Sequence, residues 1–222
     1  MCGSASTSLL TWLVSVASVI CLWWRAPWDC PRRCPRRWLG VFILSFANVQ
    51  LIDAALWFLI GSGHWFLNLA VSKFLLPIVL IGELLVSYYA ALRWGTPGWC
   101  APRYALALSL YTVSLPLTWI STCQWHTQPD PSNAYLDWCT NDCNIMTPFW
   151  RWSFLFFLLY PIAVSFPAVL LRRVTCGIIF GAFLANYHLK PFGARWCSAS
   201  KIVAVCLPVL AWCEDRQQRA QD

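Results

Sequence analysis

Residues 39–60 read LGVFILSFANVQLIDAALWFLI, and Asp53 is the one charged residue in this stretch. A helix needs about 20 mostly apolar residues to cross the hydrocarbon core of a bilayer, so the stretch predicts a transmembrane helix. Residues 66–92 are similarly apolar, and the short segment GSGH at residues 61–64 joins the two stretches. We therefore expect two antiparallel membrane helices connected by a tight turn.

The composition of the whole chain agrees with this prediction. Hydrophobic residues make up 59% of the 222 residues and charged residues 11%, whereas soluble domains are about 45–50% apolar and about 25% charged. Tryptophan, which is favoured at the boundary between lipid and water, occurs 16 times. The net charge of +7 resides mainly in short loops between apolar stretches, with no basic face on a soluble unit, so we do not expect a nucleic-acid partner.

Five further apolar stretches complete an all-α, polytopic transmembrane helix bundle with about seven spans. We expect one transmembrane domain over residues 1–213 and a short cytoplasmic tail over residues 214–222. Only Arg172 and Arg173 separate the fifth span from the sixth, which predicts a very tight turn there. The predicted spans lie near residues 9–24, 39–60, 66–92, 104–120, 149–171, 174–189 and 199–212.

The positive residues predict the orientation of these spans. With seven spans, one side of the membrane receives 11 Lys and Arg residues in its loops and C-terminal tail, and the other side receives 3. Cytoplasmic loops carry the excess of Lys and Arg, so we expect the N-terminus outside and the C-terminus inside. The chain should therefore be a multi-pass protein of the plasma membrane or an endomembrane.

The long outer loop, residues 121–147, contains three cysteines and three aspartates but no Lys or Arg. In an oxidising compartment one disulfide could form among Cys123, Cys139 and Cys143, leaving one cysteine over. The spacing of Cys139 and Cys143 also occurs in metal sites, but His126 is the only further ligand nearby, so we predict no metal.

Three charged residues fall deep inside predicted spans, where each costs at least about 2.5–3.5 kcal/mol. They are Asp53 in the second span and Lys73 and Glu83 in the third. Asp53 and Lys73 lie at similar distances from the turn at residues 61–64, so a pair between the two helices is geometrically easy. This pair could be structural, or it could belong to a polar site that binds a small ligand, an ion or a proton.

Other polar residues accompany these charges. Asn48 precedes Gln50, and the spacing of Gln50, Asp53 and Trp57 places these three on one helix face. Glu83 lies ten residues beyond Lys73, in the inner half of the span. Burial disfavours the charged form of a carboxyl group, so Glu83 is the candidate for handling a proton. The predicted ligand- or ion-binding residues are Asn48, Gln50, Asp53, Trp57, Lys73 and Glu83.

The motif Gln50-x-x-Asp53-x-x-x-Trp57, followed by Asn68 and Pro77, and the later dipeptide Trp196-Cys197 resemble an uncharacterised family of multi-span membrane proteins found in giant viruses and in algae and protists. The resemblance covers about half of the chain. It differs at Arg195, where a small or apolar residue is more usual. It implies the multi-span topology and points to Gln50, Asp53, Trp57 and Trp196, but it implies no reaction.

Three functions fit these patterns. The first is binding or transport of a small solute or ion through a polar site near Asp53, and the second is a seven-span receptor or sensor. The third is an intramembrane lipid-modifying enzyme, which would need a metal cluster or a nucleophile with a base. The three histidines, His64, His126 and His188, are not spaced as ligands on one helix, so we lean away from an enzyme and predict no catalytic residue and no cofactor. The oligomeric state is left open.

Overall fold

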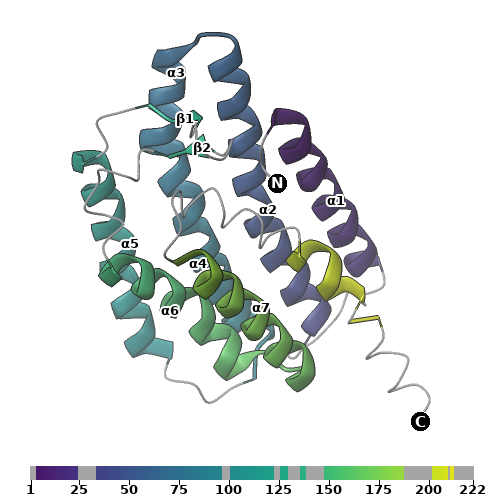
Figure 1. Ribbon diagram of the computed structural model, residues 1–222. Coiled ribbons are helices and arrows are strands. Elements are labelled where there is room, and N and C mark those ends of the chain that lie inside the picture. Colours follow the sequence, from purple (N-terminus) through teal and green to yellow (C-terminus); the bar gives the residue numbers. More distant parts are fainter. Residues whose placement is uncertain are drawn as a thin grey trace.

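The chain folds into a bundle of helices in the computed structural model (Figure 1). The structure describes residues 4–24, 34–96, 101–122, 126–129, 136–138, 148–187, 202–209 and 211–212. The helices are α1 (Ala5–Trp24), α2 (Pro35–Gly61), α3 (Trp65–Ala70), the π-helical segment η1 (Val71–Leu75), α4 (Leu76–Trp94), α5 (Ala101–Thr122), α6 (Pro148–Ser165) and α7 (Val169–Tyr187). Two short antiparallel strands, β1 (Gln128–Pro129) and β2 (Leu136–Asp137), lie between α5 and α6.

Four helices in the described part of the chain are long and apolar enough to cross a membrane. They are α1, α2, the continuous helix from Trp65 to Trp94, and α5. The predicted spans 9–24, 39–60, 66–92 and 104–120 each lie within one of them, extended by a few residues at either end. The all-α class is therefore confirmed, and the apolar helices indicate a membrane protein.

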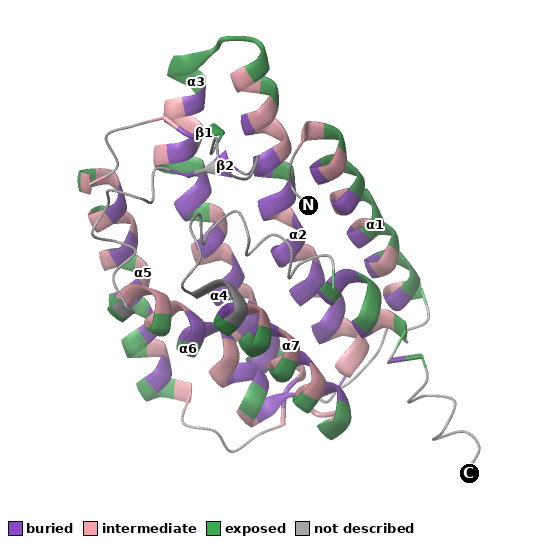
Figure 2. Ribbon diagram, in the orientation of Figure 1, coloured by how far each residue is buried: buried purple, intermediate pink, exposed green. Residues whose placement is uncertain are grey.

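The outward faces of these helices support the same conclusion. On α5 the buried positions are Tyr104, Leu108, Tyr111, Leu115 and Trp119, which repeat at helical spacing. The opposite stripe, formed by Leu106, Leu110, Val113 and Leu117, is 61–66% exposed. A soluble helix carries polar residues on its exposed face, whereas an apolar exposed face suits contact with lipid tails. Figure 2 shows exposed residues along the outer faces of α1 and α5.

The third span changes its hydrogen bonding where it approaches Pro77. Proline has no N–H, so it cannot donate to the carbonyl of Lys73, and its ring crowds that part of the preceding turn. The chain adopts a π-helical turn over Val71–Leu75 directly before this position. Such turns occur mostly as short bulges inside α-helices and frequently lie at functional sites.

The predicted tight turn at Arg172–Arg173 is wrong. Both arginines lie inside α7, and the break between α6 and α7 falls at residues 166–168. Pro167 explains the break, because proline cannot supply a helical N–H and disfavours the helical conformation of the residue before it. The backbone N–H of Arg172 already bonds to the carbonyl of Ala168 at 2.8 Å. Both arginines therefore lie within the helix, close to its start at Val169.

The α6 helix covers only part of the length of α5. The Tyr111 hydroxyl, at the middle of α5, donates to the carbonyl of Trp150, close to the start of α6. Near the other end of α6, Thr96 N–H donates to the carbonyl of Ser165 at 2.7 Å, just beyond the end of α4. In Figure 1, α6 and α7 accordingly lie against the lower half of the bundle. The predicted sixth span extends past Tyr187, and of the predicted seventh span only 202–209 and 211–212 are described.

Candidate functional site

In the upper half of the bundle, above the start of α6, the described parts of the loop between α5 and α6 contact α2 and the third span. We call the described parts of this loop, residues 126–129 and 136–138, the inserted loop. Its two strands pair Gln128 with Asp137 and Pro129 with Leu136. Thr127, Leu136 and Trp138 are each at most 1% exposed. Figure 1 shows β1 and β2 beside the upper part of α2 and of the third span.

Asp53 is fully buried in α2 and accepts a hydrogen bond from the inserted loop. The Trp138 indole Nε1 donates to the Asp53 carboxylate Oδ1 at 2.9 Å. Asp53 precedes the end of α2 at Gly61 by eight residues, a distance of about 12 Å at 1.5 Å per residue. The loop therefore reaches well into the bundle. Non-helical backbone at membrane depth is tolerated only where protein surrounds it or where it lines a cavity.

A second set of hydrogen bonds joins the inserted loop to the third span. Asn68 Nδ2 donates to the Thr127 carbonyl at 2.9 Å, and Thr127 N–H donates to Asn68 Oδ1, also at 2.9 Å. The side-chain amide thus pairs with both backbone groups of Thr127, as a neighbouring strand would. Because Asn68 and Thr127 are both fully buried, these bonds replace the water that the loop backbone would otherwise need.

Ser72 and Trp119 extend this network to α5. The Ser72 hydroxyl lies 2.6 Å from the Thr127 hydroxyl and 3.1 Å from Asn68 Oδ1, to which it donates. The Trp119 indole Nε1 donates to the Ser72 carbonyl at 3.1 Å. Ser72 is the second residue of the π-helical turn, where the regular helix bonding is altered. The turn therefore presents its backbone as well as its side chains to the site.

The predicted site residues separate into buried and half-buried groups. Gln50, Asp53 and Glu83 are fully buried. Asn48, Trp57 and Lys73 are half-buried. Asp53 bonds to Trp138, and an Asp53–Lys73 pair, whether structural or part of a polar site, stays a prediction.

Glu83 lies at a different level of the bundle from Asp53. It follows Trp65 by 18 residues, which places it about 27 Å along the third span and about 15 Å deeper than Asp53. One turn further along α4, the Ser87 hydroxyl donates to the carbonyl of Leu158 in α6 at 3.2 Å. Glu83 thus belongs to the half of the bundle that α6 covers, and the two buried carboxyl groups form separate polar positions.

Residues that sequence reasoning did not select make most of the contacts at Asp53 and Asn68. Ser72 follows Asn68 by four residues, a spacing that places both on one helix face, and this was an available signal. No sequence pattern predicts the contacts of Thr127, Trp138 and Trp119, because their partners are more than 40 residues away in the sequence.

Several other predictions concern residues that the structure describes only partly or not at all. Cys123, Cys139 and Cys143 lie outside the described residues, as do His188 and Trp196. His64 is exposed before α3, and the His126 ring lies 4.9 Å from that of Trp65. Among the described residues no group of three His, Cys, Asp or Glu side chains is placed to hold a metal ion.

Comparison of the chain with protein-family models, with curated proteins and with solved structures gave no match.

Proposed function

We propose that this chain is a multi-span membrane protein that binds and moves a small polar solute or a cation through a polar site at Asp53. The observation that carries the proposal is a fully buried aspartate inside an apolar membrane helix, held by a tryptophan from a loop that enters the bundle. Ionisable residues within membrane helices commonly mark pathways for substrates, ions and protons.

Two features of the surrounding helices support a binding site at this place. The third span contains a π-helical turn that includes Ser72 and follows Asn68, and discontinuous membrane helices often form the substrate sites of transporters. The inserted loop supplies backbone groups at the same depth. Carboxylate, amide, hydroxyl and carbonyl oxygens are the groups that coordinate a small cation or accept hydrogen bonds from a polar solute.

The wider topology belongs to the same proposal. We propose seven spans, with the N-terminus outside and the C-terminus in the cytoplasm, so that the inserted loop closes the site from the outer side. Movement of a solute would then require the Trp138–Asp53 hydrogen bond to open. Glu83, deeper in the bundle, would be the next position at which a cation or a proton could rest. Membership of the giant-virus and protist family is part of this proposal.

The test compares the wild-type protein with Asp53→Asn in liposomes. Asparagine keeps a carbonyl oxygen that can accept from the Trp138 indole, so the fold should persist while the negative charge is lost. We expect fluxes of protons, Na⁺ or K⁺, followed with fluorescent indicators, to fall to the level of protein-free vesicles. The matched control is Ser45→Ala, which removes a buried polar group of α2 that bonds only within its own helix.

Each result has a distinct meaning. Loss of flux in Asp53→Asn with an unchanged thermal unfolding temperature supports the proposal. Equal flux in the wild type and in Asp53→Asn contradicts it. Saturable ligand binding without any flux in the wild type would favour the receptor or sensor instead, and binding should then depend on Asp53.

A further inference from the structure

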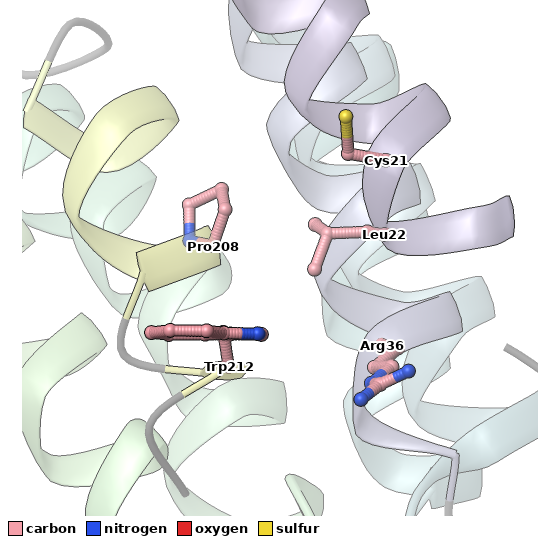
Figure 3. A pocket seen from close by; sticks show the side chains of 5 residues that line it. All are labelled: Cys21, Leu22, Arg36, Pro208 and Trp212. Atoms are coloured by element: carbon pink, nitrogen blue, oxygen red, sulfur yellow. The ribbon is translucent and has the colours of Figure 1, made fainter. Parts of the chain in front are cut away.

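A separate pocket lies at the end of the bundle opposite the inserted loop. It has room for about 60 Å³ and is lined by Cys21 and Leu22 of α1, Arg36 of α2, and Pro208 and Trp212 of the last helical segment. Figure 3 shows Cys21 and Leu22 facing Pro208 and Trp212 across the gap, with Arg36 below Leu22. Sites for whole small molecules usually measure about 300–1,000 Å³, so this pocket suits one group of a larger molecule.

The position of the pocket along the bundle corresponds to the headgroup level of a bilayer. Arg36 is the second residue of α2, 25 residues from Gly61, which is about 38 Å along the helix. The bilayer is about 30 Å thick across its hydrocarbon core and about 40–45 Å with its headgroups. An α2 that spans the membrane therefore places Arg36 near the phosphate groups of one leaflet.

The charges at this end favour an anion. The guanidinium of Arg36 can form paired hydrogen bonds to phosphate oxygens. The start of α2 carries the positive end of the helix dipole, and the residue before it, Cys34, makes no side-chain cap. Arg37 follows Arg36 directly and adds a second positive charge at the start of α2. Basic pockets between membrane helices are a known arrangement for acidic lipid headgroups.

The other walls of the pocket are mainly apolar. Leu22 is 6% exposed, whereas Trp212 keeps 41% of its surface and therefore borders the surroundings. Trp23 packs against Gly40 so closely that a Cβ there would lie 2.7 Å from the Trp23 Cδ1 atom. The Arg37 guanidinium stacks 5.7 Å from the centre of the Trp23 ring. The close packing of Trp23 on Gly40 holds the end of α1 against the start of α2.

We infer that this pocket binds the phosphate of an anionic phospholipid, with Arg36 contacting the phosphate and Leu22, Pro208 and Trp212 contacting the start of an acyl chain. The size of the pocket, its level in the bundle and its one cationic lining residue each fit this occupant. This pocket lies at the start of α2, whereas Asp53 lies toward the other end of the same helix. The lipid-binding inference therefore does not depend on the proposed solute transport.

The experiment measures lipid binding to the full-length protein by native mass spectrometry from neutral detergent. The probes are palmitoyl-oleoyl phosphatidylglycerol and palmitoyl-oleoyl phosphatidylcholine, which share acyl chains and differ in net charge. We expect one phosphatidylglycerol to bind at concentrations where phosphatidylcholine does not. Arg36→Gln should weaken this binding about fivefold, the effect of about one basic residue at a membrane surface.

Arg37→Gln is the matched control, because it removes the same charge one residue away from a side chain that stacks on Trp23 and does not line the pocket. It should leave the binding of phosphatidylglycerol nearly unchanged. Arg36→Lys keeps the charge but loses the paired hydrogen bonds, so it should bind with intermediate affinity. This variant also keeps the test informative if Arg36→Gln fails to fold.

Three outcomes would overturn the inference. Equal weakening by Arg36→Gln and Arg37→Gln would indicate general attraction to a basic surface. Equal binding of the two lipids would show that the pocket does not recognise an anion. Displacement of phosphatidylglycerol by an equal concentration of inorganic phosphate would identify a site for free phosphate rather than for a lipid.

Discussion

The two halves of the bundle fill the space beside the third span in different ways. In one half the helix α6 packs with aromatic rings, such as Phe157 at 4.9 Å from Tyr111. In the other half the inserted loop fills the space, and its hydrogen bonds with Asp53, Asn68 and Ser72 hold it. A helix satisfies its own backbone groups, whereas a buried loop must receive partners from elsewhere. Asp53, Asn68 and Ser72 supply these partners to the inserted loop.

The largest expected effect comes from removing the amide that binds the loop backbone. Asn68→Ala leaves the buried carbonyl of Thr127 without its amide donor, and the Thr127 N–H keeps only the Ser72 hydroxyl, 3.2 Å away. A buried group left unsatisfied costs about 1–3 kcal/mol. We expect the free energy of unfolding to fall by about 2–4 kcal/mol, measured by chemical denaturation in mixed micelles. Asn68→Asp keeps the acceptor and loses the donor, so its free energy of unfolding should lie between that of Asn68→Ala and that of the wild type. An unchanged stability in Asn68→Ala would contradict the role of this network.

Breaking the contact between Trp138 and Asp53 should have the next largest effect. Trp138→Phe removes the indole donor from a buried acidic group and should cost about 1.5–3 kcal/mol, the value of a hydrogen bond to a charged group. The double variant with Asp53→Ala, which removes the acceptor, should lose less than the sum of the two single changes, because the residues share one interaction. Strict additivity in this double-mutant cycle would show that the contact contributes nothing.

The helical half should respond less to loss of a polar group. Tyr104 donates to the carbonyl of Phe157 at 2.5 Å and stacks on Tyr160 at 5.4 Å between ring centres. Tyr104→Phe removes the hydroxyl but keeps the ring packing, so the expected loss is about 0.5–1.5 kcal/mol. A loss as large as that of Asn68→Ala would mean that both halves depend on polar contacts to the same degree.

Much of the fold follows from patterns that are local in the sequence. The apolar stretches at 39–60 and 66–92 predict α2 and the third span because a helix satisfies its own backbone whatever surrounds it. Hydropathy placed the break between α6 and α7 at Arg172–Arg173, whereas the backbone chemistry of Pro167 places it earlier. Charge pairs are a weaker guide to helix ends than proline, because long side chains near helix ends can reach toward the membrane surface.

The candidate site could be predicted only in part. Gln50, Asp53 and Glu83 stand out because polar residues are rare in membrane spans, and all three are buried. The partner of Asp53 could not be predicted, because Trp138 lies 85 positions away in a loop of mixed composition. The sequence suggests Lys73 as the partner of Asp53, because it lies at a similar distance from the turn at residues 61–64. Depth alone does not define which way a side chain points around its helix.

The most direct test of the account is hydrogen exchange at the Thr127 amide, measured at single-residue resolution in lipid nanodiscs. This amide donates to Asn68 at 2.9 Å inside the bundle, whereas residues 62 and 63 form an exposed turn that serves as the internal reference. We expect the Thr127 amide to exchange as slowly as the amides of α4, and to exchange faster in Asn68→Ala, where only the Ser72 hydroxyl at 3.2 Å still accepts from it. Exchange at Thr127 as fast as at Gly63 in the wild-type protein would contradict the insertion of the loop and, with it, the closed polar site at Asp53.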